Sequence, residues 1–566
     1  MSYIPSAALN AEIDSLRRYD PQAIAKIYQN RLWLVVRRAI NILFSFGYFI
    51  FCLLWDSWTK QTEQRKRLRA AELRELLTRL GPTFIKVGQA LSTRPDLVRQ
   101  DFLEELIKLQ DQLPPFPNEQ AFSLIETQLG IRIDEAYREI SAHPIAAASL
   151  GQVYRAMLHS GEEVAVKVQR PYLRPQLSLD LYLMRWGAQK FGHWLPLNLG
   201  HDLTLIVDEF GIKLFEEIDY LNEGKNAEKF AKNFHCEPEV KVPSIYWQFS
   251  NQKLLTLEWI QGFKLTDINR IRAAGIDPNT IIKIGVISGL RQLLEHGFFH
   301  ADPHPGNLFA TLDGRMAYID FGMMDQLEPG TKETIASSIV QLINQDYQAL
   351  ADDFVNLGFL SVNTKIEPII PALESVFGNA LGQSVGDFNF KTITDDFSSL
   401  MYDYPFRVPA KFALIIRSLV TQEGLALSLD PDFKIVEVAY PYVARRLLTG
   451  ESPQLRRQLL EVLFKDGRFQ WQRLENMLSI AQSDDNFDLL PTAQIGLQFL
   501  LSEEGLYLRQ QILLALTEDD RLHTEEVQRI WRLVKEDFKP QELVNVAWNA
   551  VREFSLTSVS TFLPQQ

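Results

Sequence analysis

The chain of 566 residues has few of the features that mark secreted or nucleic-acid-binding proteins. Its two cysteines, Cys52 and Cys236, cannot form a disulfide framework and show no metal-binding spacing, which favours a reducing compartment. Acidic residues outnumber basic ones, and the formal net charge of −13 argues against a nucleic-acid partner. Repeats and low-complexity tracts are also missing. The length allows about two to four domains with sizeable cores.

Long apolar runs are scarce as well, and one stretch near the N-terminus stands out. No charged residue occurs from Ala39 to Trp55, a length at the short limit for a bilayer core of about 30 Å. The run lies far from Met1 and lacks a small-residue cleavage site, which disfavours a signal peptide. Basic residues on both flanks leave its orientation open. The run could span a membrane, lie in its interface or pack on the protein body. We favour membrane association, with a soluble form as the alternative.

A short hairpin is predicted between residues 308 and 319. Two apolar runs, Leu308–Thr311 and Met316–Ile319, flank Asp313-Gly314, a strong tight-turn signal. Such a hairpin would return Asp320 to the neighbourhood of Asn307, which directly precedes the first strand.

The residues on either side of this hairpin predict phosphoryl-transfer chemistry. Asp302 is followed five residues later by Asn307, and Asp320 begins the tripeptide Asp-Phe-Gly. Carboxylate and amide oxygens suit Mg²⁺ bound to nucleotide phosphates, so we assign Asn307 and Asp320 to the metal. Asp302 would be the catalytic carboxylate, which accepts a proton or orients the nucleophile. We expect His300 to be a scaffold residue and His304 to shape the loop.

A nucleotide-binding half is predicted upstream. The β-branched strand Val164–Lys167 ends in a lysine suited to hold phosphates. The preceding segment, Ala146–Val153, can be overlaid on the kinase pattern Gly-x-Gly-x-x-Gly-x-Val, with alanine in place of the first two glycines. An alanine Cβ disfavours positive φ, so the loop should cover the nucleotide with altered geometry. The candidate ATP-binding residues are Ala146, Ala148, Ser149, Gly151, Val153, Lys167 and Glu258.

A lysine buried near phosphates requires a compensating carboxylate, because an unpaired buried charge is costly. Residues Leu214–Glu223 follow a helical pattern that carries Glu217 and Glu223 within two turns. Downstream, Leu254–Gly262 is typical of a strand that runs into a linker between two lobes.

Together these motifs make the chain similar to the ABC1/UbiB/ADCK group of atypical kinases. Four signatures carry the resemblance: Lys86-Val-Gly-Gln89 within residues 81–96, the alanine-rich loop, Glu217-Ile-Asp219, and the segment from His300 to Asn307.

The resemblance implies an ATP- and Mg²⁺-dependent protein linked to isoprenoid-quinone or lipid metabolism. It implies that Glu223 is the partner of Lys167. It also implies that Lys86, Gln89, Glu217 and Asp219 form an extra constellation, in which the Lys-x-Gly-Gln helix lies across the active site. Lys86 and Gln89 are three residues apart and therefore share one face of a helix.

The differences from ordinary protein kinases are informative. Ala301 stands where an arginine usually precedes the catalytic aspartate, and no Ala-Pro-Glu follows Gly322 at a plausible distance. A helix-like stretch begins soon after Gly330. The platform for a peptide substrate is therefore missing, which favours ATP hydrolysis or phosphorylation of a small molecule. The alternatives are a conventional protein kinase and a nucleotide-gated scaffold that binds lipids or enzymes without turnover.

We predict an α+β, two-lobed protein-kinase-like fold with an N-terminal Lys-x-Gly-Gln helical extension and an α-helical C-terminal tail. The expected parts are an N-terminal segment (1–75) with the apolar helix (39–55), the helical extension (76–140), the N-lobe (141–260), the C-lobe (261–440) and the tail (441–566).

Overall fold

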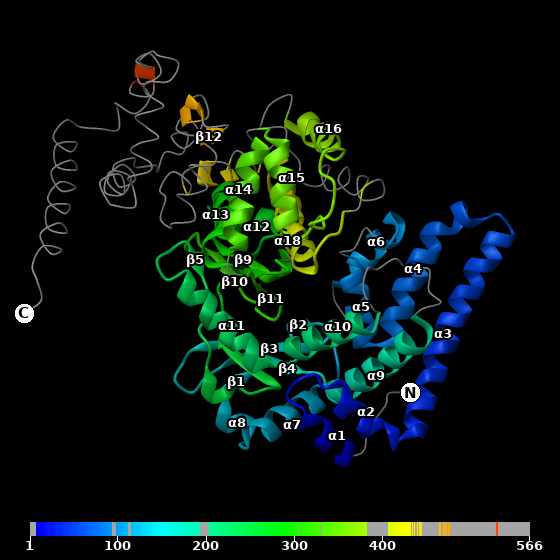
Figure 1. The fold of residues 1–566 in the computed structure, drawn as a ribbon. Helices are drawn as coiled ribbons and strands as arrows, with labels where there is room; N and C mark the ends of the chain where they lie inside the picture. Colours follow the sequence, from blue (N-terminus) through cyan, green and yellow to red (C-terminus); the bar gives the residue numbers. More distant parts are fainter. Residues whose placement is uncertain are drawn as a thin grey trace, which may run out of the picture. The chain divides into compact units, whose positions relative to one another are not determined.

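A computed structural model describes residues 7–92, 98–110, 115–192, 203–303, 305–328, 330–343, 345–381, 404 and 406–431, with short pieces between 433 and 532. The chain divides into two compact units (Figure 1). The first comprises Met1–Asp277, His300–Met324 and Ala413–Ser418, and the second comprises Pro278–Phe299, Asp325–Phe412 and Leu419–Gln566. All residues of the candidate site described below belong to the first unit.

A five-stranded antiparallel sheet forms the centre of the first unit. Its strands are β1 (Glu139–Ile140), β3 (Gly151–Met157), β4 (Glu163–Gln169) and β6 (Leu254–Glu258) in that order, with β2 (Ala146–Ala147) on β3. Val164, Val166 and Val168 of β4 are fully buried against α7 (Asn118–Leu129). Side chains alternate along a strand, so Lys167 lies on the other face of the sheet.

The predicted hairpin is present in a second, four-stranded sheet. The order is β5 (Val240–Lys241), β10 (Met316–Tyr318), β9 (Leu308–Thr311) and β7 (Gly262–Lys264). Gly314 has a φ of +80°, which glycine adopts without penalty. The Thr311 hydroxyl accepts a 2.8 Å hydrogen bond from the Arg315 amide and so closes the turn. The hairpin begins directly after Asn307 and ends two residues before Asp320.

Helices surround the first sheet, and one of them ends earlier than the sequence pattern indicates. The helical prediction for Leu214–Glu223 is wrong at Ile218 and Asp219. There the chain leaves α10 (Leu203–Glu217) and starts α11 (Tyr220–Asn233). The Asp219 carboxylate accepts from the Leu221 amide at 3.1 Å, an N-cap that competes with helix continuation.

The N-terminal apolar run lies within α3 (Leu32–Trp58), a helix held at both ends. Arg38 donates to both carboxylate oxygens of Asp180 on α9 (Leu173–Phe191), at 2.7 and 2.9 Å. At the other end, the buried Asp56 accepts from Arg69 of α4 (Thr62–Leu80) at 2.6 Å. These ion pairs fix one side of α3 to the first unit.

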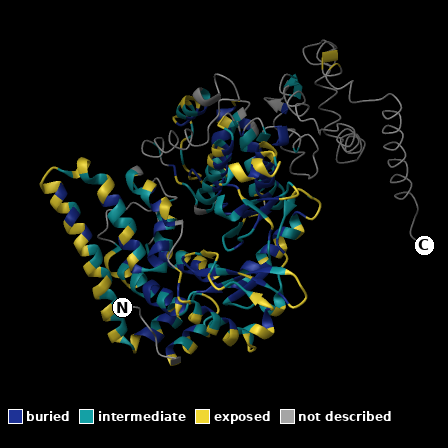
Figure 2. Cartoon of the chain, turned by 180° about the vertical axis from the view of Figure 1, so that it is seen from behind, coloured by how far each residue is buried: buried dark blue, intermediate teal, exposed yellow. Residues whose placement is uncertain are grey.

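The opposite side of α3 is exposed and apolar. Exposed fractions reach 78% for Phe44, 70% for Leu43 and 64% for Leu54. Figure 2 shows the exposed segments along the outer side of this long helix. Two helices of the described chain, Leu32–Trp58 and Lys411–Leu429, are long and apolar enough to cross a membrane. In the most apolar window, 17% of the former and 39% of the latter are buried.

The second unit is largely helical where it is described. It contains α13 (Pro278–Arg291), a π-helical turn (Gln292–His296), α14 (Thr331–Ile343), α15 (Tyr347–Asn356), α16 (Ile370–Leu381) and part of α18 (Ala410–Leu429). Leu350, Ala351 and Leu373 lie at the centre of its core. Most of the expected tail, residues 441–566, lies outside the described residues. Within it, β12 (Phe464–Lys465) pairs with β13 (Arg468–Phe469), a feature that the helical prediction missed.

The remaining elements are short or connect those above. They are α1 (Ala7–Asp14), α2 (Pro21–Gln29), α5 (Pro82–Leu91), α6 (Gln100–Ile107), Lys108–Gln110, α8 (Ile133–Ala136), Trp247–Phe249, α12 (Ile268–Ala273), β8 (Phe298–His300), Pro305–Asn307 and β11 (Met324–Gln326).

Candidate functional site

A buried ion-pair network lies at the centre of the candidate site. Lys167 extends from β4, and its Nζ donates to both carboxylate oxygens of Glu223, at 2.7 and 2.8 Å. The same nitrogen lies 3.6 Å from Oδ2 of Asp320. The side chain of Glu223 is 3% exposed, so this interaction takes place largely away from solvent. The sheet, α11 and the end of the hairpin thus meet at one lysine.

The charges of this network perturb one another. Burial opposes ionisation of Lys167, but Asp320 and Glu223 raise its pKa. Burial raises the pKa of Glu223 to about 7, although Lys167 opposes the shift. Burial would also raise the pKa of Asp320, but Lys167 and the Gly322 amide lower it to about 2. Asp320 is therefore the carboxylate that stays ionised near neutral pH, as a metal ligand must.

Asp219 has a different place from the one that we expected. Its carboxylate caps α11, four residues before Glu223, and does not lie in the wall of the pocket around Lys167. The neighbouring carbonyl of Ile218 accepts a 2.7 Å hydrogen bond from the buried Gln169 of β4. The helix that presents Glu223 is therefore fixed at its first turn to the strand that presents Lys167.

The Asp-Phe-Gly segment is tied to α11 by its phenylalanine. Asn226 donates to the Phe321 carbonyl at 3.1 Å, and the ring centroids of Phe230 and Phe321 are 5.3 Å apart. The Gly322 amide donates to Asp320 Oδ1 at 3.0 Å. These contacts fix the direction of the Asp320 carboxylate.

His300 connects the two aspartates of the site. Its Nε2 lies 2.8 Å from the Asp320 carbonyl oxygen, and its Nδ1 accepts from the Asp302 amide at 3.1 Å. This arrangement requires a neutral ring protonated on Nε2, and burial lowers the pKa of His300 in agreement. The contacts are those of a scaffold residue. His304 lies outside the described residues.

Asp302 has a partner that the sequence analysis missed. The guanidinium of Arg417 lies 2.8 Å from Asp302 Oδ1, and the two side chains are 10% and 20% exposed. Arg417 belongs to α18 and is far from the motif in sequence. No local sequence signal pointed to Arg417 as the partner of Asp302.

The Lys-x-Gly-Gln segment forms part of α5, and both of its long polar side chains line the pocket. Lys86 makes an ion pair with Glu217, the last residue of α10. Gln89 donates to the Leu109 carbonyl at 2.9 Å. A Cβ on Gly88 would lie 2.4 Å from the side chain of Leu109, so glycine permits close packing of this helix. Arg94 to Asp96 of the same motif lie outside the described residues.

The alanine-rich loop is a tight β-hairpin. Ala146 pairs with Val153, and the Ala148 amide donates to the Gly151 carbonyl at 2.8 Å. Ala148, Ser149 and Gly151 line the pocket, whereas Ala146 and Val153 belong to the supporting strands. Close contacts restrict Gly151, where a Cβ would lie 2.5 Å from a backbone carbonyl oxygen. The loop therefore has little freedom at its end.

Glu258 is a further predicted site residue that does not line the pocket around Lys167. Its carboxylate lies 2.7 Å from Lys241 and accepts from the Ser244 amide at 3.1 Å. The sequence placed Glu258 correctly at the end of a strand, but the side chain serves local structure.

The donor set around the pocket fits Mg²⁺ bound together with phosphates. Asn307 and Asp320 line one pocket with Lys167 and Asp302. Among the described residues, no group of three or more histidine, cysteine, aspartate or glutamate side chains could hold a metal on its own. Mg²⁺ commonly uses one or two protein carboxylates and takes its other ligands from phosphates and water. Two oxygen-bearing side chains therefore suffice.

Comparison with known proteins finds relatives over almost the whole chain. The ABC1 atypical kinase-like domain model matches residues 108–354, and the UbiB helical domain model matches residues 373–434. The Arabidopsis thaliana protein Activity of BC1 Complex Kinase 1, chloroplastic, is 45% identical over 96% of this chain and 83% of its own. An uncharacterized protein of Synechocystis sp. is 83% identical over 98% of each chain. The solved complex of Rv3197 with erythromycin from Mycobacterium tuberculosis has 27% identity and a TM-score of 0.46, covering 62% of this chain and 90% of that one.

Proposed function

The chain belongs to the ABC1/UbiB family of atypical kinase-like proteins, and from this premise we propose that it is an ATP- and Mg²⁺-dependent kinase or ATPase. Its activity would support isoprenoid-quinone or lipid metabolism at a membrane. The observation that carries the proposal is the convergence of Lys167, Glu223 and Asp320 in one pocket with Asp302 and Asn307. Buried titratable groups with strongly perturbed pKa values are common at functional sites.

We assign each residue a role that its position supports. Lys167, held by Glu223, would orient the nucleotide phosphates. Asn307 and Asp320 would hold Mg²⁺, which neutralises phosphate charge when it is bound. Asp302 would orient the attacking hydroxyl or water for an in-line transfer. The alanine-rich loop would cover the phosphates on the remaining side.

Two contacts favour a small acceptor or water over a protein substrate. The Lys86–Glu217 ion pair and the bond from Gln89 to the Leu109 carbonyl hold α5 in the pocket wall. A helix that occupies this wall leaves less room for an extended peptide. The same contacts, with the Asp302–Arg417 pair, also support a second candidate, a nucleotide-gated scaffold without turnover.

The proposed membrane association is supported by α3. Ion pairs at Arg38 and Asp56 hold the helix along the protein body while Phe44, Leu43 and Leu54 remain exposed. A helix attached along its length suits an interfacial position better than a span across the bilayer. The protein body would then remain in a reducing, cytoplasm-like compartment.

ATP turnover by the full chain tests the proposal. The assay contains Mg²⁺ and is run with and without vesicles that contain anionic lipid, for the parent protein and for Asp320→Asn. The matched control is Asp352→Asn, which removes an exposed carboxylate of α15. We expect turnover to fall about 100-fold or more in Asp320→Asn and to stay unchanged in the control. Nucleotide binding without turnover in every condition would support the scaffold, and equal turnover in all three proteins would refute the site.

A further inference from the structure

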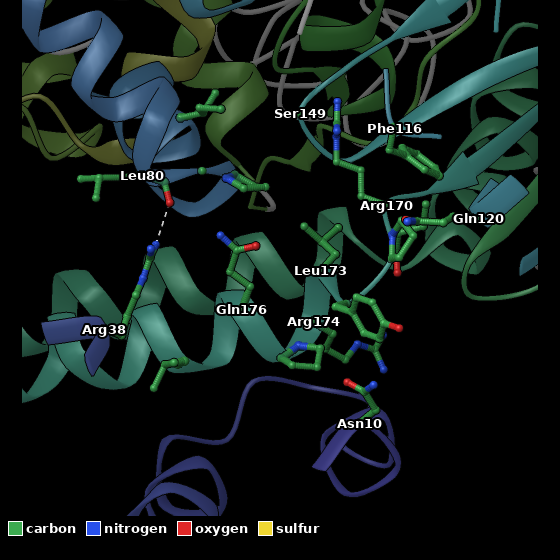
Figure 3. A pocket seen from close by; sticks show the side chains of 18 of the residues that line it. Asn10, Arg38, Leu80, Phe116, Gln120, Ser149, Arg170, Leu173, Arg174 and Gln176 are labelled. Atoms are coloured by element: carbon green, nitrogen blue, oxygen red, sulfur yellow. Dashed lines mark hydrogen bonds between the residues drawn. The ribbon is translucent and has the colours of Figure 1, made fainter. Parts of the chain in front are cut away.

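A second, larger cavity lies in the first unit. Its volume is about 1370 Å³, above the roughly 300–1,000 Å³ of ordinary small-molecule sites. Its walls come from α1, α3, α4, α5, α7, α9 and the segment that follows β4 (Figure 3). Ser149 of the alanine-rich loop also lines it, but the lysine and the carboxylates of the candidate active site do not. The cavity thus adjoins the candidate active site at Ser149 and does not contain its charged residues.

A buried arginine with unused donors lies in the cavity wall. Arg174 is 1% exposed, and its Nη1 donates to the carbonyls of Asp14 and Leu16 at 3.2 and 3.3 Å. Its Nε and Nη2 have no hydrogen-bond partner. The carboxylates of Asp14 and Asp219 act on Arg174 through their charge. The Asp14 Oδ2, however, binds Lys253 at 2.6 Å and its Oδ1 has no hydrogen-bond partner, so Asp14 provides no acceptor to Nε or Nη2. Leaving buried donors of a cation unsatisfied is costly, so the site is suited to receive an anion.

The surroundings of Arg174 favour the same ligand class. The wall also contains Arg37, Arg79 and Arg170, and basic side chains outnumber the two acidic ones, Asp14 and Glu119. Asn10, which Figure 3 places near Arg174, has an amide oxygen without a partner that could accept from a hydroxyl.

The cavity has an apolar exit along α3. Phe44 and Tyr48 line the cavity and yet are 78% and 65% exposed. Both belong to the exposed side of the apolar helix, whose neighbouring residues Leu43 and Leu54 are also exposed. A ligand with its polar end at Arg174 could therefore extend a hydrocarbon chain towards this apolar surface.

We propose that this cavity binds an anionic amphiphile. Its phosphate or similarly charged head group would accept hydrogen bonds from Arg174, and its hydrocarbon chain would leave past Phe44 and Tyr48. The ligand class follows from a buried cation at one end and an apolar opening at the other. The proposal concerns binding only and does not require the phosphoryl transfer proposed above.

Photolabelling of the full chain, without nucleotide, tests the site. The probe is a long-chain alkyl phosphate with a diazirine at the end of its chain, used below its micelle-forming concentration. We expect labelled peptides from α7 and from the Phe44–Tyr48 part of α3. Unlabelled dodecyl phosphate should compete, and dodecanol should compete at least about tenfold more weakly, because it lacks the charge-assisted hydrogen bonds. Inorganic phosphate that competes as well as dodecyl phosphate would overturn the amphiphile in favour of a free anion.

Two variants locate the ligand. Arg174→Met should weaken labelling about tenfold or more, whereas Arg272→Met, which removes an exposed arginine of α12, should not. Because Arg174 also holds backbone carbonyls near α1, a second variant leaves it in place. Ser123→Trp fills the cavity from an exposed position of α7 and should also weaken labelling, with Glu126→Trp as the control outside the wall. Unchanged labelling in both Arg174→Met and Ser123→Trp, or labels confined to Leu43 and Leu54, would refute the proposal.

Discussion

Replacement of Lys167 by methionine tests the buried network at its centre. The change removes the cation that hydrogen-bonds to both oxygens of Glu223 and lies 3.6 Å from Asp320. Removing one partner of a buried pair typically destabilises a protein by about 3–5 kcal/mol. Glu223 can relieve part of this cost by taking up a proton, because its pKa is already about 7. We therefore expect a loss near the lower end, about 3 kcal/mol at pH 7.

The pH dependence of this loss has a definite sign. A group whose pKa is higher in the folded protein than in the unfolded chain stabilises the fold fully below its unfolded pKa. For Glu223 the unfolded pKa is 4.5. This stabilisation is lost as the pH rises to the folded pKa. In the parent protein the stabilisation from Glu223 is almost entirely lost near pH 7. Without Lys167 the folded pKa of Glu223 is higher still, so the variant continues to lose stability above pH 7. The difference between variant and parent should thus widen above pH 7, by about 1.4 kcal/mol per pH unit, and stay nearly constant between pH 5.5 and 6.5.

Native-state hydrogen exchange of the α11 amides measures the difference in opening free energy between variant and parent, with rates corrected for intrinsic exchange at each pH. Local opening is the appropriate quantity because a chain of two units need not unfold in one step. The control is Lys167→Met/Glu223→Gln, which has no titrating group at position 223 and should show no widening above pH 7. A penalty that is the same at pH 7 and pH 8, or that widens equally in the double variant, would refute the reasoning.

Three further changes separate structural from chemical roles. Gly151→Ala should destabilise the alanine-rich hairpin by about 1–3 kcal/mol, because its Cβ would lie 2.4 Å from a tyrosine hydroxyl and 2.5 Å from a carbonyl oxygen; an unchanged melting temperature would contradict this. Asp219→Ala should cost about 1 kcal/mol through loss of the α11 cap and speed hydrogen exchange in its first turn. A 100-fold loss of turnover with unchanged exchange would instead place Asp219 in the chemistry. Arg417→Met removes the 2.8 Å ion pair with Asp302 and should lower kcat about tenfold or more with unchanged nucleotide affinity; an unaltered kcat would argue against a positioning role.

Local sequence signals were sufficient for several features that depend on neighbouring residues. Asp313-Gly314 predicts the hairpin because a tight turn needs a glycine that tolerates positive φ, and Gly314 has a φ of +80°. The strand that ends in Lys167 follows from three alternating valines that are fully buried. The three-residue spacing of Lys86 and Gln89 correctly put both side chains on one side of a helix, since both line the same pocket.

Other features could not be read from the sequence because they depend on distant parts of the chain. The contact of Arg417 with Asp302 joins residues far apart in sequence, and an arginine within an apolar helix carries no sign of its partner. Glu258 was placed on the correct strand, but its pairing with Lys241 depends on how the following loop returns. The helix break before Tyr220 did have a signal, since Asp219 is a good N-cap residue, but the apolar pattern on both sides obscured it.

The attachment of α3 has a consequence for which molecules the protein can reach. Arg38 and Asp56 hold the helix to the same unit that contains the candidate active site, so no flexible linker separates the two. A catalytic domain on a flexible tether samples a volume that grows with linker length. If α3 lies in a bilayer surface as proposed, the pocket would be kept at one height and one tilt above that surface. The protein would then select among lipid-bound acceptors by how far their reactive group projects from the membrane.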